Sequence, residues 1–326
     1  MGPEFQLIEA FVDAARASPH APRGPGDDAA VLPRRAGECC VTVDAVVEGV
    51  HFRRATSPLE EVGHKALAVN LSDLAAMGSR PLWALVALGV PRGFQLAEAR
   101  KLGVGFGALA RATGTAVVGG NVSRAPGLSL TVTVGGEVAP GRALLRSGAR
   151  PGDRVWVSGA LGDARLGLVL LERRRGPEAR RLRRFPRLAR TALERQRKPM
   201  PRVALGPALI GLASACIDLS DGLAQDAGHL AVASRVAVHL DAAALPVSRA
   251  FATAYPDERE RARVASSGGE DYELLFTAPA SRELAVRRLG RRLGLDLTPI
   301  GDVRRGRGVH LRGTGKAPVH GFDHLA

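Results

Sequence analysis

Aromatic residues, cysteine and lysine are scarce in this chain of 326 residues. Phe, Trp and Tyr together make up 4% of it, and there are three cysteines and four lysines. Cys39 and Cys40 are adjacent and Cys216 is far from both, which is neither a disulfide framework nor a metal-ligand spacing. We therefore expect a reducing, cytoplasmic compartment.

Long apolar runs are also missing. The longest lies around residues 82–90, well short of the roughly 20 residues that a membrane span needs. Residues 1–10 include Glu4 and Glu9 and do not show the charged-then-apolar pattern of a signal peptide. We expect no membrane association.

Positive charge is abundant but regional. The formal net charge is +14, and residues 173–202 hold twelve arginines and Lys198 against Glu178 and Glu194, a local net charge of +11. A basic chain can bind nucleic acid through its phosphates, yet Phe185 is the only aromatic residue in this segment that could stack on bases. A solvated arginine-rich helix and connector is the favoured interpretation, and a nucleic-acid patch is the alternative.

The length and the 45% hydrophobic content suggest two folded domains. Helical and strand patterns alternate, which indicates an α/β or α+β fold. We expect domains at 1–140 and 150–326. In the first, the patterns predict helices at 5–17, 60–77 and 98–113, a largely buried strand at 39–43, and strands at 29–32, 83–90, 115–118 and 128–134. In the second, they predict a strand at 154–158, a helix at 163–171, a strand-turn-helix unit at 215–231 and a strand at 272–277.

Acidic and amide side chains gather beside glycines or at strand ends in six clusters. The clusters lie at residues 24–30, 42–44, 70–78, 117–121, 217–222 and 266–276. Adjacent carboxylates such as Asp27 and Asp28 repel each other, and a bound cation or a shifted pKa relieves that repulsion. Carboxylates combined with substrate phosphates are the usual ligands of Mg²⁺. The pattern therefore favours phosphoryl transfer or another ATP-dependent step.

Four of these clusters also have a structural interpretation that the sequence leaves open. Residues 24–30 fit an exposed turn, and Asp73 fits a helix cap. The paired glycines at 119–120 fit a hairpin turn. Ser220 or Asp221 fits the cap of the helix that follows.

Together and in this order, several segments resemble the thiamine-monophosphate kinases. That family belongs to the ATP-binding superfamily that includes aminoimidazole-ribonucleotide synthetase and selenophosphate synthetase. The matching segments are residues 4–8, 26–30, 49–52, 65–78, 141–144, 146–149, 151–153, 217–222, 267–274 and 321–324. The runs 70–78 and 268–274 are the most specific of them.

The resemblance implies direct, in-line transfer of the γ-phosphate of ATP to thiamine monophosphate, with several Mg²⁺ ions. It also implies a two-domain aminoimidazole-ribonucleotide synthetase-like fold and a homodimer formed by the mixed-sheet N-terminal domain, which would also bind ATP and Mg²⁺. Carried over by motif, the implied metal ligands are Asp28, Thr42, Val43, Asp44, Asp73, Asn121, Asp218 and Asp221, with Asp73, Asp218 and Asp221 at the catalytic centre. The implied nucleotide contacts are Gly120, Asn121, Arg146 and Ser220, and the implied substrate contacts are His51, Glu270 and Phe322.

Three positions depart from the family pattern. Asn121 stands where the family usually has Asp, so an oxygen ligand is kept but a charge is lost. Val43 stands where Thr is common, so only its backbone carbonyl could bind a metal. Gly103 stands where we expect an aromatic residue near the adenine.

Two other functions are compatible with the same sequence. One is a superfamily relative that uses ATP on an amide or acyl acceptor. The other is a nucleotide-binding protein with weakened catalysis, because Asn121 weakens one metal site.

Overall fold

The computed structural model describes residues 3–15, 36–172 and 175–313. The chain divides into two compact units. The first comprises Met1–Leu74 and Ser79–Gly141, and the second comprises Ala75–Gly78 and Arg142–Ala326. Each is a mixed α/β unit, as the alternating patterns predict.

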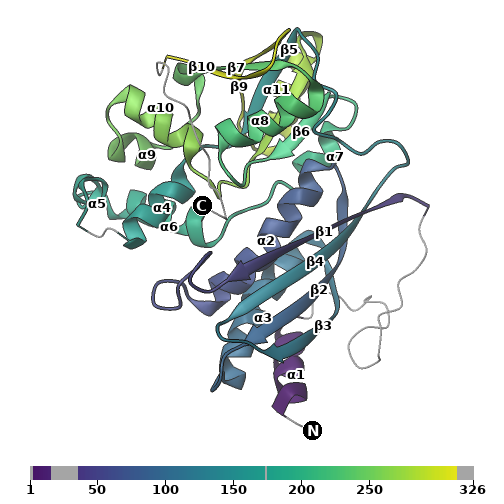
Figure 1. Cartoon of the computed structure of the whole chain (residues 1–326), viewed down its shortest axis with the longest axis vertical. Helices are drawn as coiled ribbons and strands as arrows, with labels where there is room; N and C mark the ends of the chain where they lie inside the picture. Colours follow the sequence, from purple (N-terminus) through teal and green to yellow (C-terminus); the bar gives the residue numbers. More distant parts are fainter. Residues whose placement is uncertain (1–2, 16–35, 173–174, 314–326) are drawn as a thin grey trace. The chain divides into compact units, whose positions relative to one another are not determined.

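The first unit is a four-stranded mixed sheet with helices α2 and α3 on one face (Figure 1). Its elements are α1 (Pro3–Ala15), β1 (Glu38–Val47), α2 (Leu59–Ala76), β2 (Arg80–Val90), α3 (Leu96–Thr113), β3 (Ala116–Arg124) and β4 (Ser129–Val138). The strand order is β1-β4-β2-β3, with β2 and β3 parallel and the other pairs antiparallel. Leu130, Val132 and Val134 of β4 are fully buried on the covered face.

Strand β1 differs from its prediction in length and burial. It continues to Val47, so Asp44 lies inside the strand and does not end it. It is an edge strand, and Val41 and Val43 are each 58% exposed. A β-branched run predicts a strand, but whether a second strand or a helix covers it depends on distant parts of the chain.

Strand β3 also continues beyond its predicted end. Gly119, Gly120 and Asn121 are paired in register with Leu85, Val86 and Ala87 of β2, so the hairpin interpretation is wrong. A Cβ at Gly120 would overlap the carbonyl oxygen of Val86. This glycine is therefore explained by the close approach of two strands.

The second unit is built on a six-stranded sheet of order β10-β7-β9-β5-β8-β6. Its strands are β5 (Asp153–Ser158), β6 (Ala215–Asp218), β7 (Ala237–Asp241), β8 (Leu274–Pro279), β9 (Leu297–Arg304) and β10 (Gly308–Arg312). Its helices are α4 (Asp163–Glu172), α5 (Pro177–Leu182), α6 (Pro186–Arg197), α7 (Leu205–Leu209), α8 (Leu223–Ser234), α9 (Arg249–Ala254), α10 (Glu258–Ser267) and α11 (Glu283–Leu293). Two short 3₁₀ turns lie at Ala242–Ala244 and Ala280–Arg282.

The structure confirms most of the predicted elements in the described residues. The prediction of a strand at 29–32 lies outside them. Strands β7, β9 and β10 and helices α7 and α9 to α11 were not predicted. Strand β8 begins at Leu274, two residues late, because Tyr272 has a left-handed backbone conformation (φ 49°) that no strand accommodates. Among the described helices, none is long and apolar enough to cross a membrane.

Candidate active site

In the first unit, Thr42 and Asp73 meet. The Thr42 hydroxyl donates a hydrogen bond of 2.7 Å to Asp73 Oδ2. Asp73 lies in the last turn of α2, which ends at Ala76, so it cannot be an N-terminal cap. A carboxylate is disfavoured at this negative end of a helix dipole, which points to a role other than helix stability.

Alternation along β1 separates the neighbouring site residues. Thr42 and Asp44 are two residues apart and share the face that α2 covers, whereas Val43 points to the open face. Opposed residues in the sheet place Asp44, Val132, Val86 and Gly120 in one row, with Asp44 and Gly120 on the two edge strands. Three strand spacings amount to about 14 Å.

Asn121 belongs to the neighbouring row, opposite Ala87, and therefore to the open face of the sheet. Within one chain it lies at the opposite edge and on the opposite face from Asp44. The first unit therefore brings Thr42 and Asp73 together but keeps Asn121 and Gly120 apart from Asp44.

His51 lies in the turn after β1, and its ring and backbone are both anchored. Its Nδ1 accepts the backbone N–H of Val47 at 3.1 Å, and its carbonyl oxygen accepts a hydrogen bond from Lys65 Nζ at 3.3 Å. Because Nδ1 is an acceptor, the neutral ring carries its proton on Nε2. Gly103 is packed against α1, where a Cβ would lie 2.5 Å from the carbonyl oxygen of Phe11, so the expected aromatic residue has no room there.

In the second unit, two predicted site loops are joined by backbone hydrogen bonds. Leu219 N–H donates to Glu273 O at 2.8 Å, and Tyr272 N–H donates to Leu219 O at 2.8 Å. The N–H of Glu270 donates to Ser220 O at 2.7 Å. The loop after β6, with Asp218, Ser220 and Asp221, therefore lies beside the loop before β8, with Glu270.

The side chain of Asp226 binds the backbone of the loop after β6, a role that the sequence did not reveal. Its Oδ2 accepts the backbone N–H groups of Asp221 (3.2 Å) and Gly222 (3.1 Å). The N-cap of α8 is Gly222 and has no side-chain cap, so the capping interpretation of Ser220 and Asp221 is wrong. The acid in the first turn of α8, directly after the acidic cluster at 217–222, was the available signal.

Burial raises the pKa of Asp226 to about 7, and the nearby charge of Asp221 adds to that increase. The two backbone N–H groups and the positive charge of Arg146 act in the opposite direction. Ligand atoms of Asp221, Asp226 and His229 lie within 4.8 Å of one another, a grouping that could hold a metal ion. Asp218, at the end of β6, is 4% exposed.

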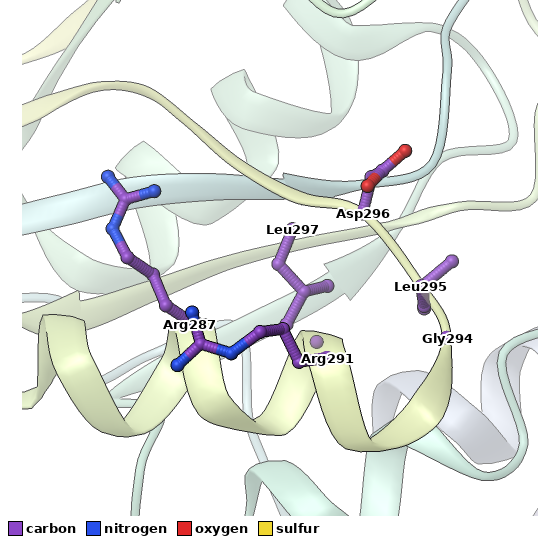
Figure 2. Close-up of a pocket in the computed structure, with 7 residues that line it drawn as sticks. Arg287, Arg291, Gly294, Leu295, Asp296 and Leu297 are labelled. Atoms are coloured by element: carbon purple, nitrogen blue, oxygen red, sulfur yellow. The ribbon is translucent and has the colours of Figure 1, made fainter.

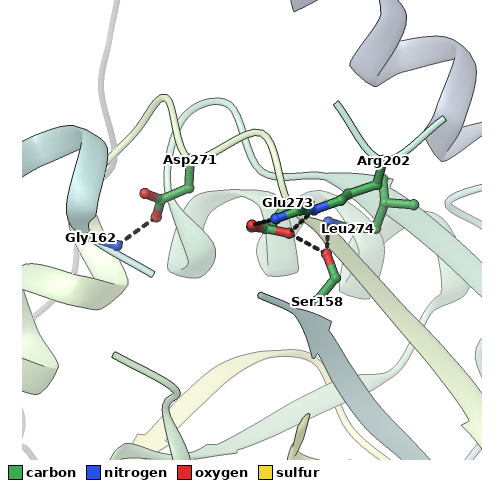
Figure 3. A network of polar contacts seen from close by, with 6 residues as sticks. All are labelled: Ser158, Gly162, Arg202, Asp271, Glu273 and Leu274. Atoms are coloured by element: carbon green, nitrogen blue, oxygen red, sulfur yellow. Dashed lines mark hydrogen bonds and ion pairs between the residues drawn. The ribbon is translucent and has the colours of Figure 1, made fainter. Parts of the chain in front are cut away.

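A buried ion pair between Arg202 and Glu273 lies next to the second loop (Figure 3). Glu273, only 2% exposed, accepts hydrogen bonds from both Arg202 Nε (2.6 Å) and a terminal nitrogen of Arg202, and from Ser158 Oγ (2.5 Å). Burial raises the pKa of Glu273, and the bonds from Arg202 oppose that increase. Asp271 accepts the N–H of Gly162 at 2.8 Å, and burial holds its pKa well above the usual value.

Arg146, Asp28 and Phe322 are the remaining predicted site residues. Arg146 has an exposed side chain, while its carbonyl oxygen accepts a hydrogen bond from Ser234. Asp28 and Phe322 lie outside the described residues.

A pocket of about 280 Å³ between α11 and the start of β9, lined by Arg287, Arg291 and Asp296 among others, includes none of the predicted site residues (Figure 2).

Comparison with known proteins identifies the family. The family model for AIR synthase related protein, N-terminal domain, matches residues 26–138, and that for the C-terminal domain matches residues 150–313. The fold and paired acidic loops thus define a member of the AIR synthase related proteins.

Individual relatives indicate one family within the AIR synthase related proteins. The thiamine-monophosphate kinase of Salmonella typhimurium is 38% identical over 99% of this chain and 98% of its own length. The crystal structure of thiamine-monophosphate kinase from Stenotrophomonas maltophilia matches with a TM-score of 0.86 at 41% identity, covering 95% of this chain and 97% of that one. AaThiL complexed with AMPPCP and TMP matches with a TM-score of 0.77 at 34% identity, covering 92% and 91%. The chain belongs to the thiamine-monophosphate kinase family.

Proposed function

We propose that this chain phosphorylates thiamine monophosphate to thiamine diphosphate with ATP. The observation that carries the proposal is the similarity to thiamine-monophosphate kinases along nearly the whole of both chains. AaThiL, a similar structure, holds AMPPCP and TMP together, a nucleotide analogue and a phosphorylated acceptor.

The proposed reaction is one displacement at phosphorus. A phosphate oxygen of thiamine monophosphate attacks the γ-phosphorus of ATP, the bond from that phosphorus to the bridging oxygen breaks, and ADP leaves. The attacking oxygen is already ionised at neutral pH, so no general base is required. Catalysis then depends on positioning and on neutralising charge.

The side chains of the two joined loops suit that task. Asp226 holds the loop after β6 through the N–H groups of Asp221 and Gly222, which keeps Asp218, Ser220 and Asp221 in one arrangement. Ser220 and Arg146 are the proposed nucleotide contacts on this unit, with Gly120 and Asn121 on the first. His51, Glu270 and Phe322 are the proposed contacts of the acceptor.

The donor groups fit Mg²⁺ because they are almost all hard oxygens. When bound, Mg²⁺ would neutralise the phosphates during transfer. The residues proposed to hold it are Asp28, Thr42, the Val43 backbone, Asp44, Asp73, Asn121, Asp218 and Asp221. The hydroxyl of Thr42, 2.7 Å from Asp73, would orient that carboxylate.

We also propose a homodimer formed through the first unit. Support comes from the open face of its sheet, where Val41 and Val43 are each 58% exposed on an edge strand. The same face carries Asn121. Because Asp44 and Asn121 lie at opposite edges, we propose that one nucleotide receives them from different protomers.

A cytoplasmic location fits this proposal. All three cysteines are free thiols, and Cys39 is exposed, as is usual in a reducing compartment.

A coupled assay of ADP formation tests the function. We expect turnover that requires both thiamine monophosphate and Mg²⁺. We expect Asp73→Asn to reduce kcat by about 100-fold or more, because weaker Mg²⁺ binding leaves the phosphate charge less neutralised during transfer. Asp296→Asn, an exposed acid outside the proposed site, is the matched control. Folded protein that forms no ADP in response to thiamine monophosphate would refute the proposal, and turnover with an amide or acyl acceptor instead would identify a superfamily relative.

Asn121 favours one second candidate, a nucleotide-binding protein with weakened catalysis. Asn121→Asp restores the usual family charge. A large gain in kcat with unchanged nucleotide affinity would support the second candidate, whereas full turnover of the unmodified chain would dismiss it.

A further inference from the structure

Among the described residues, the arginine-rich segment contributes one buried polar side chain, Gln196. Several arginines of α5 and α6, such as Arg180, Arg187 and Arg190, are exposed, but Gln196 of α6 is only 4% exposed. Its Nε2 donates a hydrogen bond of 2.7 Å to Oε2 of Glu270. The sequence suggests that this segment is a solvated surface. In the structure, it directly contacts Glu270, which is proposed to bind thiamine monophosphate.

Glu270 stands on an unusual backbone. Its φ is +69°, in the left-handed region, which is a strained conformation for a residue other than glycine. The bond from its N–H to Ser220 O at 2.7 Å holds it there. Backbone strain that surrounding contacts maintain is typical of functional positions. Here the strained backbone fixes the direction in which the Glu270 side chain leaves the main chain.

The position of Gln196 is equally constrained. Helix α6 packs on α4 at Gly167, where a Cβ would overlap the carbonyl oxygen of Ala192 and lie 2.7 Å from the Cβ of Gln196. A few residues after α6, Arg202 is bound to the buried Glu273. The two helices and this ion pair leave Gln196 little freedom to move away from Glu270.

The chemistry of the donor matters. An amide can orient a carboxylate through a hydrogen bond without adding a positive charge. The nearby guanidinium of Arg202 is directed to Glu273 instead. The hydrogen bond from Gln196 thus orients the Glu270 carboxylate, whose negative charge would attract the cationic thiazolium ring of the acceptor.

We propose that Gln196 is a positioning residue that aims the Glu270 carboxylate at the cationic ring of the acceptor. This inference rests on the proposed function. It gives part of the arginine-rich segment a role in selecting the acceptor. The binding of ATP would not depend on Gln196.

The test is steady-state kinetics of Gln196→Met, which keeps length and helix propensity but removes the donor. We expect the KM for thiamine monophosphate to rise about tenfold, the size of a lost hydrogen bond to a charged group, while the KM for ATP and the Tm stay close to wild type. Arg190→Gln, on the exposed side of the same helix (side chain 72% exposed), is the control and should change neither KM.

A double variant separates the hydrogen bond from the charge. Gln196→Glu with Glu270→Gln keeps an amide–carboxylate pair but moves the carboxylate off position 270. We expect its KM for thiamine monophosphate to match that of Glu270→Gln alone; recovery to the wild-type KM would overturn the proposal.

Other outcomes are equally decisive. An active wild type with an unchanged KM in Gln196→Met refutes the positioning role and leaves the proposed function standing. Equal changes in both KM values together with a lower Tm would show a merely structural role and also refute it. A folded wild type with no response to thiamine monophosphate removes the proposed function, and this inference with it.

Discussion

At the scale of single residues, the pair Arg202–Glu273 places opposite charges in the interior of the second unit. Their side chains are 16% and 2% exposed. Removing one partner of such a pair leaves the other charge buried without compensation, which is costly.

Arg202→Met should therefore destabilise the fold by about 3–5 kcal/mol, measured by urea unfolding. Arg80→Met removes the partner of Glu137 from an ion pair in which the Arg80 side chain is 63% exposed, and it should cost about 0–1 kcal/mol. Equal losses in the two variants would contradict the importance of burial.

Two aspartates should give stability opposite dependences on pH. Burial raises the pKa of Asp163, against a hydrogen bond from Ser248 Oγ of 2.6 Å. The folded state then binds this proton more tightly than the unfolded state, so stability falls as pH rises from about 4 through the folded pKa. Asp163→Asn keeps an oxygen acceptor, and its stability relative to wild type should be higher at pH 7 than at pH 4.

Asp302 is the control for that experiment. A hydrogen bond from Arg304 lowers its pKa, so its contribution is present above about pH 4 and is lost as pH falls through the folded pKa. Asp302→Asn should lose more stability at pH 7 than at pH 3. Urea unfolding between pH 3 and pH 7 measures both pH dependences. If the stability of both variants relative to wild type changed with pH in the same direction, the opposite pKa shifts of Asp163 and Asp302 would be contradicted.

At the scale of elements, close helix packing depends on glycine. Gly167→Ala in α4 would force α6 away through overlap with Ala192 and should cost about 1–3 kcal/mol. In α8, the nearest atom to a Cβ on Gly228 is 4.0 Å away, so Gly228→Ala should stabilise by about 0.5–1 kcal/mol. Thermal unfolding of both variants checks the prediction, and a stabilising Gly167→Ala would disprove the packing argument.

Elements also show where sequence patterns are sufficient. Helix α2 was predicted within a residue or two because its pattern and the following Gly78 are local signals. Strands β1 and β3 were predicted too short, and β1 was predicted buried. Their extent depends on pairing with β4 and β2, which no local pattern records.

At the scale of the whole molecule, the open sheet face predicts self-association. We expect a mass twice the 34.2 kDa of the chain by light scattering. Val41→Asp places a charge on that face and should give monomers. Val232→Asp, at a valine that is 77% exposed on α8, should remain dimeric, whereas a dimeric Val41→Asp would rule out this interface.

The sequence by itself determined the mixed α/β class, the family and the acid-rich clusters, because periodicity and motif residues are local and can be read directly. It did not determine which clusters meet. Glu270 lies beside Ser220 because β8 pairs with β6, and Asp44 and Asn121 lie apart because β4 and β2 separate their strands. Gln196 reaches Glu270 across 74 residues of chain through the packing of α6 on α4. Such contacts follow from strand order and helix packing, which are long-range properties that only the tertiary structure decides.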